Sequence, residues 1–330
     1  MSREIAFTKM VGAGNDFVIV DARRGRHPLA GVWPKVARAV CDRHRGIGAD
    51  GVLVLEPSRK ADVRMRIFNA DGSEAEMCGN GARCVAWYAA NASRARAASA
   101  KGRTAARGST SRRAEVTIET QAGLLSAVVS GERVEMVLSE PHDLRLDGQL
   151  AIDGRTIRYG FVNTGVPHAI VPVERLDDVE VDRLGRAIRR HEAFQPKGTN
   201  VNFVQAVSPS KVRVRTYERG VEAETLACGT GVAASAVIHA AEQVRAGNGH
   251  ATEPGAPRSG VARKRSTMPI VRPARESSHA IDVETRSGDI LNVRLAVSCT
   301  GQGYRAARVV LTGPARRVCA GTFSWPMGSA

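Results

Sequence analysis

Residues 68–90 read FNADGSEAEMCGNGARCVAWYAA, and the rest of the chain is arranged around this stretch. Cys78 is followed by Gly79, Asn80 and Gly81, which open directly onto an apolar, alanine-rich pattern typical of a buried helix. The pattern predicts that Cys78 lies at a helix N-terminus, where backbone N–H groups are unpaired and the helix dipole is positive. Such a position favours the thiolate form of a cysteine and can bind an anion beside it.

The same pattern returns about 150 residues later, as expected of an internal repeat. Residues 212–240, VRVRTYERGVEAETLACGTGVAASAVIHA, align with residues 63–90, VRMRIFNADGSEAEMCGNGARCVAWYAA, so that Cys228 takes the place of Cys78. A shorter echo relates GIGADGV at 46–52 to GTNVNFV at 198–204. We therefore expect two equivalent halves, and a face-to-face arrangement would point both thiols into one cleft.

Length and composition are those of a globular protein with ample material for a core. The chain has 330 residues, and its six cysteines lack metal-ligand spacing, so they are interpreted as reduced thiols. No early apolar run resembles a signal peptide, and no stretch reaches the roughly 18 apolar residues of a membrane span. These features predict a cytoplasmic protein without a membrane segment.

The formal net charge of +15 is concentrated in two segments. Residues 93–114 contain seven basic and no acidic residues, and residues 245–277 contain seven basic and two acidic residues. Both are rich in Ala, Gly, Ser and Arg and lack a sustained apolar period, so we expect disordered surface insertions. A nucleic-acid-binding role for these insertions is the alternative from a different class.

The remaining pattern predicts an α+β fold with two pseudo-symmetric domains, each a mostly antiparallel sheet or barrel wrapped around one central helix. Strands are expected at 5–10, 17–20, 52–55, 63–68, 115–120, 124–129, 134–138, 159–162, 169–173, 280–284, 290–296 and 304–311. Shorter helices are expected at 34–43 and 179–191. The boundary between the halves is placed between residues 121 and 122, and the second half is expected to run to residue 311.

Two cysteines at equivalent positions suit the inversion of a carbon centre, in which one group removes a proton from one face and the other adds a proton to the opposite face. No lysine in a pyridoxal-phosphate context and no metal cluster is evident in the sequence, so no cofactor and no metal are expected. The two helix N-termini would stabilise the charge that builds on a substrate carboxylate.

The chain resembles diaminopimelate epimerase in GAGNDF at 12–17, FNADGSEAEMCGNGARC at 68–84, GVPH at 165–168, TNVNF at 199–203 and YERGVEAETLACGTG at 217–231. The resemblance implies cofactor-independent interconversion of LL- and meso-diaminopimelate, in the biosynthesis of lysine and a peptidoglycan precursor. It implies that Cys78 and Cys228 are the base and acid, that the enzyme is a homodimer, and that the strand at about 312–330 completes the first half. No nucleic-acid or membrane partner is expected. Another two-cysteine enzyme, such as a proline or hydroxyproline racemase, is the closest alternative.

The resemblance also assigns the other site residues. His168 and Glu218 match positions that tune the pKa of the thiols. The expected substrate contacts are Asn15, Asn69, Gly79, Asn80, Asn200, Glu218, Arg219, Gly229 and Thr230. Two positions depart from the family pattern: Val166 stands where many members have asparagine, so that one contact is missing or supplied by Asn163, and Gly51 stands where some have glutamine. These departures affect substrate contacts and leave the cysteines untouched.

Overall fold

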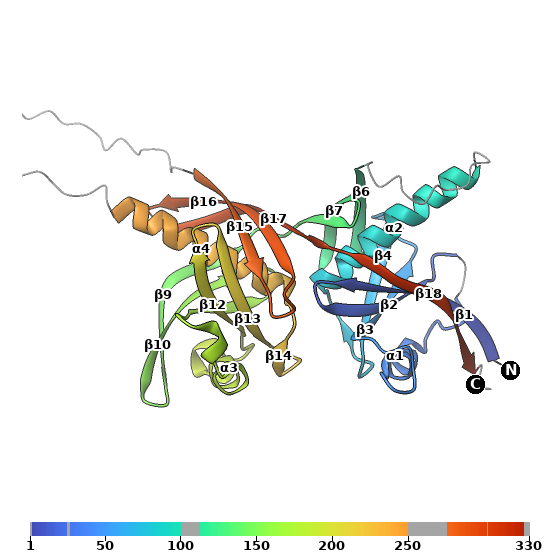
Figure 1. The fold of residues 1–330 in the computed structure, drawn as a ribbon, viewed down its shortest axis with the longest axis horizontal. Coiled ribbons are helices and arrows are strands. Elements are labelled where there is room, and N and C mark those ends of the chain that lie inside the picture. Colours follow the sequence, from blue (N-terminus) through green and yellow to red (C-terminus); the bar gives the residue numbers. More distant parts are fainter. Residues whose placement is uncertain (1, 25–26, 101–112, 250–275, 302, 327–330) are drawn as a thin grey trace, which may run out of the picture.

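The computed structural model describes residues 2–24, 27–100, 113–249, 276–301 and 303–326. Figure 1 shows two lobes side by side, with the N-terminal half of the chain in one and most of the C-terminal half in the other. Each lobe is a curved sheet around one long helix, α2 in the first and α4 in the second. The α+β class predicted from the sequence is confirmed.

The first half contains eight strands and two helices among its described residues. They are β1 (Ser2–Gly12), β2 (Asn15–Asp21), α1 (Trp33–Cys41), β3 (Gly51–Glu56), β4 (Val63–Asn69), β5 (Glu74–Ala75), α2 (Gly79–Ala100), β6 (Ala114–Thr120), β7 (Gly123–Ser130) and β8 (Arg133–Val137). The turn between β1 and β2 is a two-residue hairpin loop in which Ala13 and Gly14 both have positive φ, 52° and 84°. This geometry matches the twist of the flanking strands and places Asn15 at the loop.

The second half repeats this order. It comprises β9 (His142–Ile152), β10 (Arg155–Asn163), β11 (Pro167–Pro172), a short 3-10 helix (Leu176–Asp178), α3 (Val181–Arg190), a second 3-10 helix (Glu192–Phe194), β12 (Asn200–Ser208), β13 (Lys211–Glu218), β14 (Ala223–Thr225), α4 (Gly229–Gly249), β15 (Glu276–Glu284), β16 (Ile290–Thr300) and β17 (Gly303–Pro314). The last strand, β18 (Arg316–Pro326), crosses to the first lobe (Figure 1).

Strand pairing makes the pseudo-symmetry explicit. In the first half the pairing runs β18–β1–β2–β3–β4–β6–β7–β8, and in the second half it runs β9–β10–β11–β12–β13–β15–β16–β17. Two strand pairs in each half are parallel. They are β2–β3 and β4–β6 in the first half, and β11–β12 and β13–β15 at the equivalent places in the second half. The two halves join where β8 pairs with β17. The strand that corresponds to β9 is therefore β18, contributed by the far end of the chain.

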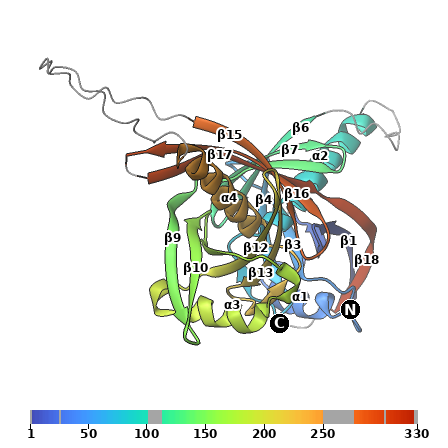
Figure 2. The same ribbon diagram turned by 60° about the vertical axis from the view of Figure 1, so that its left-hand side comes forward.

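Each long helix is nearly apolar all round because a sheet surrounds it. The core around α2 includes Val85 and Ala86 from the helix and Leu53, Ile118 and Met136 from the strands. The core around α4 is built in the same way. The other face of β2 and β3 packs on α1, and α3 covers the equivalent sheet face in the second half. Figures 1 and 2 both place α1 and α3 on one side of the two lobes, away from the outer ends of α2 and α4.

The packing of β7 and β8 bears on the boundary expected between residues 121 and 122. Ala127 and Val129 of β7 and Val134 and Met136 of β8 are buried against α2, in the core of the first half. Because a strand belongs with the core that covers its apolar face, we propose a boundary between β8 and β9 instead. The first half then consists of β1–β8 with β18, and the second of β9–β17.

The two basic segments begin differently from what their composition predicted. Helix α2 continues to Ala100 and α4 to Gly249, so the first residues of both expected insertions are helical, and β15 begins at Glu276. The prediction of disorder was wrong for these residues, because alanine and arginine have high helix propensity. For residues 101–112 and 250–275 the prediction lies outside the described residues.

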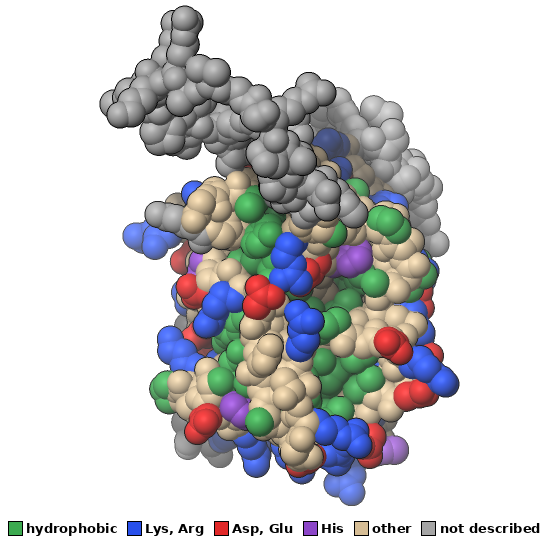
Figure 3. Space-filling view, turned by 90° about the vertical axis from the view of Figure 1, so that its left-hand side faces the viewer, with side chains coloured by type: hydrophobic (Ala, Val, Ile, Leu, Met, Phe, Trp, Pro, Cys, Tyr) green, Lys and Arg blue, Asp and Glu red, His purple; other side chains and the backbone are tan. Residues whose placement is uncertain are grey.

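Charged side chains of the second half are often paired with opposite charges. Arg245 lies 2.6 Å from Asp147, and Arg213 lies 3.0 Å from Asp177. Figure 3 shows the end of this half, where the described basic side chains are interspersed with acidic and hydrophobic ones. The described part of this face is therefore not a continuous positive surface of the kind that nucleic acid requires. Within the described ranges, no helix has the length and apolar character needed to cross a membrane.

Candidate active site

The N-termini of α2 and α4 meet at the junction of the two halves. A methyl group placed on Gly79 would lie 3.7 Å from the Cα atom of Gly229, so the two glycines are nearly in contact. Cys78 directly precedes α2 and is partly exposed, whereas Cys228 directly precedes α4 and is 8% exposed. Both are free thiols. The repeat thus brings the two cysteines to facing helix ends.

Burial is the largest influence on both thiols. It raises the pKa of Cys78, and the negative charge of Glu218 raises it further, while the Gly81 N–H group, 3.5 Å from Sγ, acts in the opposite direction. The pKa of Cys228 is raised by burial and by Glu218, and is lowered by hydrogen bonds from Thr230 and Gly231. The thiolate bias expected from the helix N-termini is therefore outweighed in this structure by desolvation.

Cys228 is linked to a buried histidine through Thr230. The Thr230 hydroxyl lies 3.4 Å from Cys228 Sγ and 3.0 Å from Nε2 of His168. On its other side, His168 Nδ1 lies 3.0 Å from the amide nitrogen of Asn202, whose oxygen accepts a bond of 2.9 Å from Thr216. Because the Asn202 amide donates, Nδ1 accepts and Nε2 carries the proton toward Thr230. Thr230 can then donate its own proton to Cys228.

His168 is neutral in this arrangement. Its side chain is 0% exposed, and burial, together with the positive charge of Arg219, lowers its pKa to about 3. The sequence did not single out Asn202 or Thr216, although Asn202 is the second asparagine of TNVNF. The feature that could have identified them is a polar residue at an inward-facing strand position, because a buried polar side chain there requires a hydrogen-bond partner.

Asn80 occupies the position equivalent to Thr230 in the first half and connects the two halves. Its amide nitrogen donates to the Asn15 side-chain oxygen at 2.6 Å and to the Ala227 carbonyl at 3.1 Å. Its oxygen accepts a bond of 2.7 Å from Arg83. Asn15 in turn donates to Asp50 at 2.8 Å. Both asparagines expected to contact substrate therefore also bind each other, and Arg83 and Asp50 were not foreseen.

The other expected contacts lie at the ends of equivalent strands. Asn69 ends β4 and donates to Ser73 Oγ at 3.0 Å, and Glu218 ends β13. Asn200 begins β12 and accepts a bond of 2.7 Å from the Arg219 backbone N–H group, while the Arg219 side chain donates to the Lys197 carbonyl at 3.1 Å. The structure thus brings Asn200, Glu218 and Arg219 together, with Glu218 close enough to act on both thiols.

A sequence model of the family described as diaminopimelate epimerase matches residues 7–141 and 160–253. The chain belongs to the diaminopimelate epimerase family. It is 44% identical over 241 residues to the diaminopimelate epimerase of Aquifex aeolicus, covering 70% of this chain and 80% of that protein. Identity to the diaminopimelate epimerase of Archaeoglobus fulgidus is also 44%, over 246 residues, covering 71% of this chain and 81% of that one.

Solved structures confirm the fold of this family member. A hydroxyproline epimerase from Agrobacterium vitis superposes with a TM-score of 0.58 at 17% identity, covering 98% of this chain and 91% of that chain. A phenazine biosynthesis protein of the PhzF family from Bacillus anthracis gives 0.57 at 16% identity, covering 97% and 99%. At such low identity these structures support the architecture alone.

The structure shows the surroundings of Val166 and Gly51, the two positions that depart from the family pattern. Val166 is partly exposed beside Gly165, whose N–H group donates to Asn163 Oδ1 at 3.0 Å, so the oxygen of Asn163 is engaged within its own loop. A methyl group on Gly51 would lie 2.8 Å from the Phe68 carbonyl oxygen. A side chain at residue 51 would therefore require the backbone to move.

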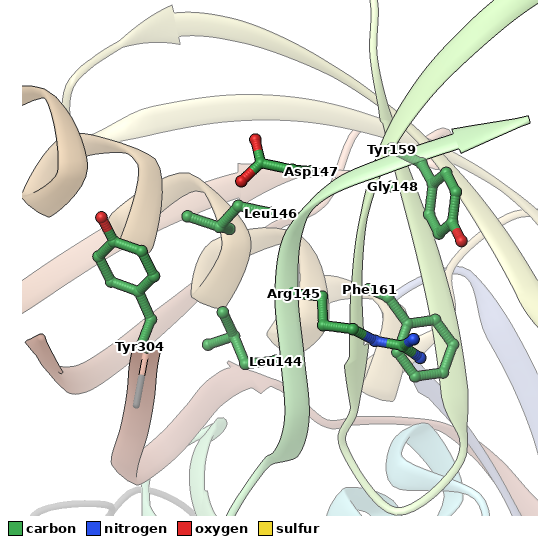
Figure 4. Close-up of a pocket in the computed structure, with 9 residues that line it drawn as sticks. Leu144, Arg145, Leu146, Asp147, Gly148, Tyr159, Phe161 and Tyr304 are labelled. Atoms are coloured by element: carbon green, nitrogen blue, oxygen red, sulfur yellow. The ribbon is translucent and has the colours of Figure 1, made fainter. Parts of the chain in front are cut away.

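Cys84 and a hollow beside β9 and β10 lie outside the site formed by Cys78 and Cys228. Cys84 is 0% exposed in the core around α2, and burial raises its pKa to about 12. Among the described residues no group of three His, Cys, Asp or Glu side chains could hold a metal ion. A hollow of about 460 Å³ lies against β9 and β10, where Arg145 lies over the Phe161 ring (Figure 4). None of its lining residues belongs to the cysteine site.

Proposed function

We propose that this chain interconverts LL- and meso-diaminopimelate by a two-base mechanism with Cys78 and Cys228. The observation that carries the proposal is the meeting of two equivalent helix N-termini, each preceded by a cysteine. This arrangement offers one thiol to each face of a carbon bound between the helices. The 44% identity to proteins named diaminopimelate epimerase supports the choice of substrate.

In the proposed reaction, one cysteine acts as a thiolate and removes the Cα proton, while the other acts as a thiol and delivers a proton to the opposite face. The roles are exchanged in the reverse direction. Backbone N–H groups at Gly79, Asn80, Gly229 and Thr230 bind the adjacent carboxylate and stabilise the negative charge that develops on it. Substrate binding brings its ammonium group near the thiols, and this positive charge favours the thiolate.

The far end of the substrate carries a second carboxylate and a second ammonium group. Arg219 supplies a cation for the carboxylate, while Asn69, Asn200 and Glu218 supply oxygens for the ammonium group. Glu218 is suited to this part because burial already raises the pKa of its carboxyl, so a bound cation stabilises its charged form. A substrate without these distal groups, such as proline, would leave them unpaired.

Turnover in heavy water tests the mechanism. If the delivering thiol carries a proton from solvent, early product should contain deuterium at Cα while recovered substrate remains unlabelled. Product that retains the substrate's own hydrogen at early times would rule out the two-base assignment. A parallel panel with proline and hydroxyproline separates the closest alternative, because turnover of either in preference to diaminopimelate would reassign the substrate. The homodimer and the cytoplasmic location remain predictions.

A further inference from the structure

Arg83 is a buried cation in the first turns of α2. Its side chain is 0% exposed. Nη2 donates to Asn80 Oδ1 at 2.7 Å, and Nε lies 3.5 Å from the Pro314 carbonyl in the segment that leads from β17 to β18. Nη1 is buried without a hydrogen-bond partner among the described residues. Across the ranges that the structure describes, no carboxylate forms an ion pair with Arg83.

Burying the Arg83 guanidinium in this way is energetically unfavourable. A buried charge is stable only when paired or fully hydrogen-bonded, and a guanidinium remains charged under all ordinary conditions. The repeat shows that the fold itself does not require this cation, because the equivalent residue in α4 is Ala233, also 0% exposed. The positive charge is thus specific to the helix that follows Cys78.

We propose that Arg83 is a positioning residue that holds Asn80 in place and stabilises the thiolate form of Cys78 relative to that of Cys228. This inference rests on the proposed two-cysteine function. It assigns different acidities to two thiols that the repeat makes equivalent. Arg83 acts through the helix and through Asn80, without touching the substrate.

The contacts of Asn80 support the positioning role. Its amide nitrogen binds the Ala227 carbonyl, directly before Cys228, and Asn15 on the β1–β2 loop. Arg83 binds the oxygen of the same amide, which fixes its orientation. Without Arg83 the amide would lose one of its three hydrogen bonds, and the link between the N-termini of α2 and α4 would be weakened.

The charges around Cys78 support the electrostatic role. Burial raises the pKa of Cys78 and Glu218 of β13 adds to this effect, while the backbone N–H groups of Gly81 and Asn80 oppose it together with the charge of Arg83. Cys228 faces the pair from the start of α4, and its own pKa is raised by burial, Glu218 and the Cys78 charge, with no cation among the causes. Arg83 itself is approached by Cys84 of α2 and by Asp289, just before β16. Of these groups, Arg83 alone is positively charged.

The test measures alkylation of each thiol by iodoacetamide at several pH values, with peptide mass spectrometry to separate Cys78 from Cys228. In Arg83→Met, which keeps the length of the apolar stem, the pH at which Cys78 becomes reactive should rise. The ratio of Cys78 to Cys228 modification near neutral pH should fall about tenfold, as expected for about one pKa unit. Arg83→Lys, which keeps the charge, should retain most of the wild-type ratio.

Trp87→Phe is the matched control, because it removes a bond of 2.9 Å from the same helix to the Gly131 carbonyl without changing a charge. Its ratio should equal that of the wild type. If Arg83→Met does not fold, Gly313→Ala replaces it, since the added methyl would lie 2.9 Å from Arg83 Nε and displace the guanidinium. That exchange should lower the ratio in the same direction.

An unchanged ratio in a folded Arg83→Met or Gly313→Ala protein would overturn the proposal, as would an equal fall in Trp87→Phe. The alkylation needs no substrate, so it is independent of the heavy-water experiment. Failure of the proposed function would appear as absent turnover, whereas failure of this inference would appear as thiols that are insensitive to Arg83.

Discussion

Asn80 and Thr230 stand at the same place in the two halves, two residues after a cysteine, and each joins that cysteine's helix to a buried basic side chain. In the first half the basic group is Arg83, from the same helix. In the second half it is His168, from β11. Similar backbones therefore support two different polar arrangements around two chemically identical thiols.

The neighbouring strands explain why the arrangements differ. His168 pairs with Asn200 across the parallel strands β11 and β12, as Phe17 pairs with Gly51 across β2 and β3. Phe17 and the nearby Leu53 are apolar and pack in the core around α2, so the first half has no strand-borne histidine or asparagine there. Its polar network instead joins Arg83 and Asn80 of the helix to Asn15 beside the β1–β2 loop.

The comparison shows how a symmetric fold can carry an asymmetric charge. Arg83 is a permanent cation, whereas His168 is neutral because burial lowers its pKa to about 3. A two-base mechanism needs one thiolate and one thiol at the same time. That requirement is met by the permanent charge of Arg83 in the first half and by the neutral hydrogen bonds from His168 through Thr230 to Cys228 in the second.

The largest effect is expected from removing either thiol. Cys78→Ala and Cys228→Ala should each lower turnover in both directions by about a thousandfold or more, because each direction requires both groups. Epimerisation assays in both directions, with circular dichroism to verify folding, measure this. Cys84→Ala is the control in the same helix and should retain activity. Substantial turnover in either single variant would remove that cysteine from the mechanism.

A smaller effect is expected from breaking the hydrogen-bonded link between His168 and Cys228. Thr230→Val removes the hydroxyl that lies between Nε2 and Sγ, which should raise the pKa of Cys228 and lower turnover about 10- to 100-fold. Thr230→Ser keeps the hydroxyl and should stay within a few-fold of wild type. Equal losses in both variants would show that the methyl group, rather than the hydroxyl, matters.

His168 should make stability depend on pH. Its folded pKa of about 3 lies below the unfolded value near 6.5, so the unfolded chain binds the extra proton and stability is lost as pH falls from about 6.5 toward 3. Between pH 7 and 5 this amounts to about 2 kcal/mol of unfolding free energy. Urea titrations should show that His168→Asn reduces the loss by this amount, whereas exchange of the exposed His44 does not. An unchanged loss would contradict a buried neutral His168.

The smallest effect is expected from the two basic segments, which follow α2 and α4 at equivalent places in the repeat. Replacing residues 101–112 and 250–275 with short glycine–serine linkers should change the unfolding free energy by less than about 1 kcal/mol, because their composition offers little apolar surface to a core. Turnover should also be preserved. Salt-sensitive DNA or RNA retention that disappears with the segments would instead assign them a binding role.

Several features followed from the sequence because they depend on local pattern. Repeat spacing placed Cys78 and Cys228 at equivalent helix starts, and apolar periodicity indicated the α+β class and most of the strands, although not β9, β12 and β13. The motifs around both cysteines were specific enough to indicate the family. The roles of His168, Glu218 and the substrate contacts remain predictions, although the structure gathers most of these residues near the two helix ends.

Other features depended on contacts between distant parts of the chain. That β18 pairs with β1 is decided by a strand edge that only the folded first half presents. The assignment of β7 and β8 to the first core depends on which helix their apolar faces meet. The sequence pattern singled out neither Arg83 nor Asn202. Only tertiary structure encloses both side chains, because burial and hydrogen-bond partners arise when two sheets close around two facing helices.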